Sequence, residues 1–203
     1  MSATATLTLR WLIPRLSSLQ IGNPTIEIRL TTSNEPIETL DEPFDMIIRR
    51  GSEEVAGYVI VWSLREYRIP VCSPKLLARI PIDRLQDLEK HTLLHSTSRP
   101  TLWSDWLKAA WVVDLKPRRS LVFEHNYQTL QAAIDGLGVA TAASALIDDD
   151  IIAGRLALPF LGPKLPAEGY CAYVPKAKST NQTIMKFCKW LQRVSPAEGT
   201  SSE

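Results

Sequence analysis

The feature that most constrains the fold is the alternation of strand-like and helix-like segments, which is clearest across His125–Ala140. A short apolar run, Leu121–Phe123, precedes this stretch. Apolar residues then recur at helical spacing from Leu130 to Leu137, two glycines end the helix, and strand-like Val139–Ala142 follows. This order predicts a β–α–β unit. Its polar turn would lie beside unpaired helix N–H groups, where an acceptor-rich ligand can bind.

The same alternation runs through all 203 residues and predicts an α/β fold with largely parallel sheets. Strands are expected at 3–9, 25–30, 44–48, 58–71, 93–95, 121–123, 139–142, 155–158 and 169–174. Helices are expected at 11–19, 37–40, 74–78, 83–88, 102–110, 126–137, 144–152 and 183–194. So many short strands favour two lobes with a ligand cleft between them over one sheet.

Composition and charge exclude several classes of protein. The net charge is +1 with no basic stripe, so the chain is not expected to bind DNA by itself. No apolar run approaches the about 20 residues that span a bilayer, and the amino terminus does not resemble a secretory signal. Cys72, Cys171 and Cys188 are widely separated, as expected of reduced thiols in a cytoplasmic protein. The polar tail, 195–203, is expected to be disordered.

Catalytic and metal-binding patterns are missing from the sequence. There is no Gly-x-Ser-x-Gly or His-Glu-x-x-His motif, and Gly136–Gly138 follows a helix, the reverse of a dinucleotide-binding loop. His91, His95 and His125 lie at strand ends without an obvious nucleophile. Asp148–Asp150 cannot converge on a metal from one helix face, and we expect a solvated surface there. The sequence predicts no enzyme, metal or cofactor.

A set of short motifs resembles the effector-binding (regulatory) domain of LysR-type transcriptional regulators, closest to the branch with the glycine-cleavage activator. The motifs occur in family order and span about residues 6–191. They are Trp11–Leu16, Asn23–Ile28, Phe44–Arg49, Pro70–Leu77, Trp103–Leu107, Leu130–Ala133, Gly136–Ala140, Ala153–Leu156, Gly169–Pro175 and Phe187–Leu191.

The resemblance implies two Rossmann-like lobes joined by two crossover strands, as in type II periplasmic binding proteins. Lobe I would comprise 1–66 plus 175–203, lobe II would comprise 67–174, and the crossovers would lie near 65–71 and 170–175. A small-molecule effector would bind between the lobes and change a homodimer or tetramer. The family's winged helix-turn-helix is absent from this sequence, so promoter DNA, and possibly RNA polymerase, would be contacted only by the full-length protein.

Four predicted loops carry the candidate ligand-binding residues: Thr6, Thr8, Thr32, Ser33, Thr97, Ser98, Asn126 and Tyr127. Hydroxyls, an amide and helix ends suit a small, polar, anionic effector. Thr6 stands where the family pattern has a serine, which weakens the assignment of the family's ligand-binding role to this residue. Each loop also has a structural interpretation, such as Asn126 capping its helix. Arg99 could pair with a carboxylate or be solvated.

Other residues favour structural roles. We expect Arg49 or Arg50 to fix Asp45 or the strand exit, and Trp11, Trp103, Trp106 and Trp190 to be core or lobe-interface aromatics. The helix around Trp11–Leu19 and the segment Ile37–Leu40 are expected to expose apolar residues for dimerisation. A free-standing type II solute-binding protein for a small anionic ligand and a small α/β enzyme are the alternatives.

Overall fold

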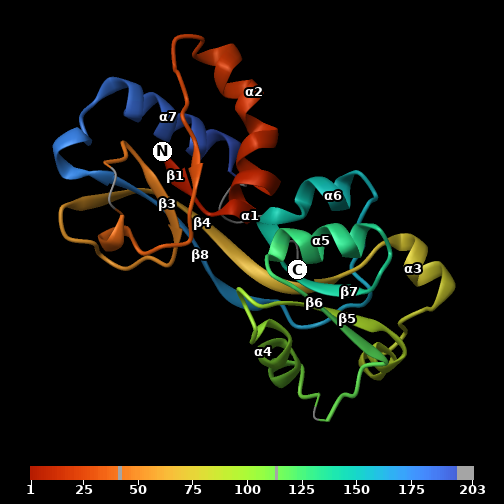
Figure 1. Ribbon diagram of the computed structural model, residues 1–203. Helices are drawn as coiled ribbons and strands as arrows, with labels where there is room; N and C mark the ends of the chain where they lie inside the picture. Colours follow the sequence, from red (N-terminus) through yellow and green to blue (C-terminus); the bar gives the residue numbers. More distant parts are fainter. Residues whose placement is uncertain (41–42, 113, 196–203) are drawn as a thin grey trace. The chain divides into compact units, whose positions relative to one another are not determined.

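The computed structural model describes residues 1–40, 43–112 and 114–195 (Figure 1). Its strands are β1 (Ser2–Ala3), β2 (Thr31–Thr32), β3 (Ile47–Arg50), β4 (Tyr58–Val71), β5 (Thr92–Ser96), β6 (Arg119–Phe123), β7 (Val139–Ala143) and β8 (Leu165–Pro175). Its α-helices are α1 (Ala5–Leu7), α2 (Ile13–Gly22), α3 (Pro74–Arg79), α4 (Leu102–Ala109), α5 (Asn126–Ile134), α6 (Asp148–Ile152) and α7 (Gln182–Val194). A π-helical stretch, η1 (Thr8–Leu12), joins α1 to α2. Short 3-10 turns are η2 (Ile37–Thr39), η3 (Leu85–Lys90), η4 (Ser144–Leu146) and η5 (Lys176–Lys178).

The chain forms two compact units. Unit 1 contains 1–65 and 168–203, and unit 2 contains 66–167. Strands β4 and β8 each continue from one unit into the other, as the two predicted crossovers require. The segment 168–174, which we assigned to lobe II, belongs to unit 1 because β8 pairs with β3 there, Ile48 opposite Ala172.

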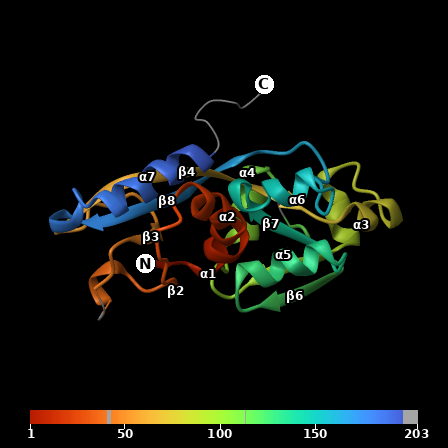
Figure 2. The same ribbon diagram turned by 90° about the horizontal axis from the view of Figure 1, so that it is seen from above.

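Unit 1 is built on the strand order β2-β1-β3-β8-β4. The first three strands are parallel, and β8 is antiparallel to β3. The helices α2 and α7 lie side by side in both views (Figures 1 and 2), and Trp190 Nε1 on α7 donates to Ser18 Oγ on α2 at 2.9 Å. The buried Trp11 ring packs on Trp62, with ring centroids 5.3 Å apart. Tertiary contacts with α7 and β4 therefore stabilise the helical segment formed by η1 and α2.

Unit 2 is built on the strand order β4-β7-β5-β6, with β5 parallel to both of its neighbours. Alternate strand residues face two cores. Leu94 and Ala140 pack with α5, whereas Leu93 and Val139 pack with Trp103 and Trp106 of α4. Figure 1 accordingly shows α5 and α6 on one side of these strands and α4 on the other. This layering places the loops of unit 2 at the two ends of its parallel strands.

Several sequence-based assignments are wrong in detail. The alternating segment 25–30 forms no strand, and only Thr31–Thr32 pairs, with β1. The expected strand 3–9 ends at Ala3, because helix begins at Ala5. The segment 155–158 makes only an isolated bridge, between Cys72 and Ala157. In each case the apolar pattern was present, but no neighbouring strand was available over the full length to complete a ladder.

Two charged sites also differ from expectation. Asp150 is not solvated; it is 4% exposed and accepts from Arg155 Nε at 2.6 Å. Asp45 is not held by the arginines but pairs with Lys178 Nζ at 2.6 Å. Arg49 nevertheless has a structural role, because its guanidinium donates to Ser2 Oγ at 2.9 Å and to the Glu35 carbonyl at 2.8 Å.

The remaining expectations concern the aromatics, the cysteines and the tail. Trp11, Trp103, Trp106 and Trp190 are all buried, as predicted. The three cysteines are free thiols, and burial raises the pKa of Cys72 to about 12. The predicted disordered tail lies outside the described residues except for Ser195, which accepts a hydrogen bond from Trp62 Nε1 at 2.8 Å. Among the described helices, none has the length and apolarity to cross a membrane.

Candidate functional site

The first loop of unit 1 gathers polar atoms that have lost water without gaining a partner. Thr4 is the N-cap of α1, with extended backbone, and Thr8 begins η1 one turn later. The Oγ1 atoms of Thr4 and Thr8 and Nε1 of Trp11 are buried, and among the described residues none of them has a hydrogen-bond partner. Native proteins rarely leave such atoms unpaired, because each costs about 1–3 kcal/mol. The cluster is therefore a candidate ligand-binding site.

The second predicted loop of unit 1 lies at the same end of its parallel strands. Ser33 N donates to the Ala3 carbonyl at 3.0 Å, so it follows β2 directly beside the residue that precedes Thr4. Its Oγ accepts from Glu35 N at 3.0 Å, which is the turn interpretation. The hydroxyl proton of Ser33 remains available to a ligand. Thr32 is exposed on β2, and Thr6 is partly exposed on α1.

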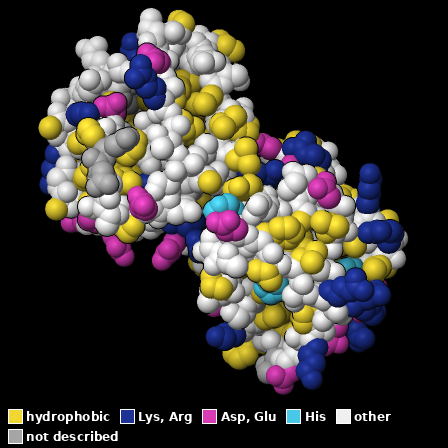
Figure 3. Space-filling view, in the orientation of Figure 1, with side chains coloured by type: hydrophobic (Ala, Val, Ile, Leu, Met, Phe, Trp, Pro, Cys, Tyr) yellow, Lys and Arg dark blue, Asp and Glu magenta, His cyan; other side chains and the backbone are white. Residues whose placement is uncertain are grey.

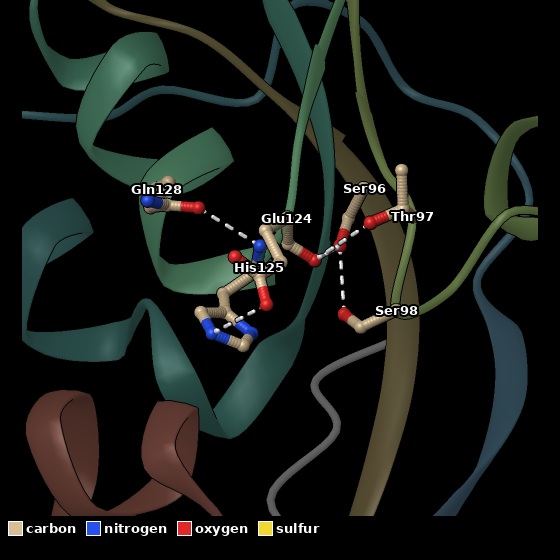
Figure 4. A network of polar contacts seen from close by, with 6 residues as sticks. All are labelled: Ser96, Thr97, Ser98, Glu124, His125 and Gln128. Atoms are coloured by element: carbon tan, nitrogen blue, oxygen red, sulfur yellow. Dashed lines mark hydrogen bonds and ion pairs between the residues drawn. The ribbon is translucent and has the colours of Figure 1, made fainter.

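In unit 2, the two predicted loops are bonded to each other (Figure 4). Thr97 N donates to the Phe123 carbonyl at 2.8 Å and Ser98 N to the Glu124 carbonyl at 3.1 Å. The Glu124 carbonyl also accepts from Ser96 Oγ at 3.0 Å, and from Thr97 Oγ1 at 3.4 Å. The carboxyl ends of β5 and β6 thus bring Thr97 and Ser98 together with the segment that begins α5.

Counting protons in this network indicates what a ligand could offer. A hydroxyl has one proton, and that of Ser96 is donated to Glu124. With the Ser96 proton on the Glu124 carbonyl, Ser98 is the donor in the 2.8 Å contact between Ser96 Oγ and Ser98 Oγ. What remains at Ser98, and largely at Thr97, is lone pairs. These hydroxyls suit a ligand that donates, such as an ammonium or hydroxyl group.

The helix α5 begins at the expected residue but has a different cap. His125 is the N-cap and Asn126 is the first helical residue, so the predicted Asn126 cap is wrong. His125 N donates to Gln128 Oε1 at 2.9 Å, and the His125 ring stacks on Tyr127 with centroids 5.3 Å apart. Asn126 Nδ2 donates to Thr129 Oγ1 at 3.3 Å, and Thr129 Oγ1 donates to the Asn126 carbonyl at 2.7 Å. This network orients the amide and leaves Asn126 Oδ1 as an acceptor.

Two further residues of unit 2 lie near this end of β5. His95 carries a buried Nε2 without a partner, and burial lowers its pKa, so the ring is neutral near pH 7. Arg99 follows Ser98, and its backbone N–H donates to the Ser96 carbonyl at 3.1 Å. His95 can offer one donor or one acceptor at its buried Nε2. The backbone of Arg99 forms part of a turn.

Sequence reasoning missed Thr4 and the indole of Trp11. Thr4 carried a usable signal, because a threonine before an apolar helical stripe is a typical N-cap. The unpaired state of its hydroxyl could not be predicted, since it depends on backbone geometry and packing. Among the described residues no group of His, Cys, Asp and Glu could hold a metal ion.

Comparison with known proteins agrees with this architecture. The family model for the LysR substrate binding domain matches residues 1–196. The glycine cleavage system transcriptional activator of Escherichia coli (strain K12) is 31% identical over 191 residues, covering 94% of this chain and 62% of that protein. The transcriptional activator AmpR of Pseudomonas aeruginosa is 30% identical over 199 residues, covering 97% of this chain and 65% of that protein. The chain thus spans about 62–65% of these relatives.

A solved structure resembles the fold over nearly the whole chain. The effector domain of AmpR from Pseudomonas aeruginosa superimposes with a TM-score of 0.75 at 30% identity, covering 95% of this chain and 93% of that one. The two-lobed, type II periplasmic-binding-protein-like fold is therefore correct. The matched relatives are transcriptional regulators rather than enzymes. The chain belongs to the LysR substrate-binding domain family.

Proposed function

We propose that this domain senses a small polar metabolite that carries both a carboxylate and a hydrogen-bond donor, such as an amino acid. The observation that carries the proposal is the cluster of unpartnered buried atoms at Thr4, Thr8 and Trp11. All three can donate, and two hydroxyls with one indole N–H match the oxygens of a carboxylate. Thr4 caps the first helical segment, whose amino end also favours negative charge.

The groups of unit 2 favour the other end of such a ligand. Thr97, Ser98 and Asn126 Oδ1 offer mainly acceptors once their internal hydrogen bonds are assigned. An ammonium group would satisfy them. This refines the predicted anionic effector to one with a net charge near zero.

Binding would then control transcription through an assembly of full-length regulators in the cytoplasm, with promoter DNA and RNA polymerase contacted by that assembly. The residues expected to mediate self-association need revision, because Trp11, Leu19 and Ile37 are buried. The same helix exposes Leu9, Ile13 and Ile21 instead, the last at 85%. Ile21→Arg should therefore leave folding intact and shift a dimer toward monomer in size-exclusion chromatography with light scattering.

A thermal-shift screen of amino acids and small carboxylic acids tests the proposed ligand class. A ligand at about 100 times its Kd stabilises the folded state by about 2.7 kcal/mol. For a domain of this size, that raises Tm by roughly 5–10 °C. Amino acids should give larger shifts than matched acids without the amino group. Equal shifts, or shifts only with dianions, would contradict the two-ended ligand.

A further inference from the structure

A cavity of about 480 Å³ lies wholly within unit 2, away from the hydroxyl loops. Thr92 and Arg119 line it and are the first residues of β5 and β6, and Leu137 lines it just before β7. The cavity is thus at the amino ends of these strands, whereas Thr97 and Ser98 follow the carboxyl end of β5. Its volume falls within the range of small-molecule pockets, about 300–1,000 Å³.

The lining of this cavity is strongly basic. Its cationic side chains are Arg79, Lys90, Arg118 and Arg119, and none of its lining residues is an aspartate or glutamate. Figure 3 shows Lys and Arg side chains gathered on unit 2 beside α3. Like charges that line one cavity repel one another, so an anion in the cavity would stabilise this arrangement.

Two of the four cations already have partners, and two do not. Arg79 Nη2 donates to the Gly136 carbonyl at 3.3 Å, where it also neutralises the end of α5. Lys90 Nζ pairs with Asp87 at 2.8 Å. Within the described part of the chain, Arg118 and Arg119 have no ion pair or hydrogen bond through their side chains. Guanidinium groups that line one cavity can each bind an anionic group in bidentate fashion.

A buried and unpaired imidazole completes the pocket. His91 lines the cavity and is 2% exposed, and neither of its ring nitrogens has a well-aligned hydrogen-bond partner in the described part of the chain. Burial lowers its pKa, opposed by the Pro81 backbone and the charge of Asp87. Neutral His91 therefore presents one acceptor and one N–H donor; the Pro81 carbonyl approaches the ring without a well-aligned hydrogen bond, and a bound oxygen would satisfy the donor better.

We propose that this pocket is a second ligand site, specific for a small molecule that carries two or more anionic groups of phosphate or carboxylate type. Arg118 and Arg119 bind the anionic groups, and His91 donates to an oxygen at the floor. Because the pocket lies at the opposite ends of the strands, it can be occupied independently of the proposed effector site. An experiment that disproves this second site would therefore leave the proposed effector site untouched, and the reverse also holds.

Isothermal titration of the domain with pyrophosphate and with citrate, at constant ionic strength, tests the site. We expect saturable 1:1 binding of at least one of them. Arg118→Gln with Arg119→Gln should weaken it about tenfold or more. The matched control, Lys186→Gln with Lys189→Gln, removes the same charge from exposed positions of α7 in unit 1 and should change affinity less than about twofold.

The two probes distinguish the sources of the anion, since a preference for pyrophosphate indicates phosphoryl ligands and one for citrate indicates carboxylates. Arg118→Gln alone is the second variant if the double variant does not fold. Equal weakening in the control, or no saturable binding of either probe, would overturn the site. An oligoglutamate peptide that binds more tightly than both probes, and depends on the same arginines, would assign the surface to an acidic protein partner and overturn the small-molecule proposal.

Discussion

Replacing Thr8 by valine tests two effects of its hydroxyl group separately: the loss of folding stability in the free domain and the gain in effector binding. Thr8 is 5% exposed and its Oγ1 is buried without a partner. Valine has the same shape and removes the oxygen, so the free domain no longer carries an unsatisfied group that costs about 1–3 kcal/mol. Val and Thr have similar helix propensities, so the helix itself should be unaffected. We therefore expect the free energy of unfolding to rise by about 1 kcal/mol, the lower end of that range.

Urea unfolding of the ligand-free domain measures this change, and Tm should rise by roughly 2–4 °C. Thr183→Val is the matched control, since Thr183 is exposed on α7 and its substitution should alter stability by less than about 0.5 kcal/mol. Effector affinity should fall in the Thr8 variant by about 10- to 100-fold, the loss of one hydrogen bond to a carboxylate. A variant less stable than wild type by 1 kcal/mol or more would refute the reasoning, because the hydroxyl would then be satisfied in the free domain.

Three further perturbations test other parts of the structure. Asn126→Ala combined with Ser33→Ala should weaken effector binding in calorimetry much more than it lowers Tm; equal losses would leave both residues with structural roles only. Asp87 has a pKa lowered to about 2, chiefly by its hydrogen bond with Lys90, so its contribution to stability is complete above about pH 4 and is lost as pH falls toward 2. Asp87→Asn should flatten the stability curve in that window, and an unchanged curve would contradict the assignment. Gly138→Ala would place a Cβ 2.3 Å from the Thr92 carbonyl and should destabilise the domain by several kcal/mol in urea unfolding, whereas Gly22→Ala, where the added Cβ meets only an ordinary contact at 3.8 Å, gives the comparison.

The layering of strands and helices could be predicted from sequence wherever one face of an element is buried. The run Tyr58–Val71 was expected as one long strand and is β4, and α7 was expected from its apolar stripe. The segment 25–30 has an equally clean alternation but forms no strand, since pairing requires a partner elsewhere in the chain. Periodicity reports burial, and it does not report which strand is adjacent.

The candidate site was predictable in composition but not in its hydrogen bonding. Ser33 and Thr97 directly follow strands, as expected, whereas Thr8 and Asn126 lie in the first turns of helical segments. Whether a hydroxyl is already committed depends on distances that no sequence pattern specifies. Ser98 donates to Ser96, whereas Thr8 has no partner, although both are simple hydroxyl residues in the sequence. The basic pocket was missed because its arginines, separated in sequence from Arg79 and His91, converge only in the fold.

The central claim, that the domain senses a two-ended metabolite through these hydroxyl groups, is tested most directly by an NMR titration. The amide resonances of the domain would be followed while the compound with the largest thermal shift is added. We predict the largest perturbations at Thr4, Thr8, Ser98 and Asn126, and their loss in Thr8→Val at the same ligand concentration. Perturbations confined to other residues, such as Thr92 and Arg119, or unchanged by that substitution, would contradict it.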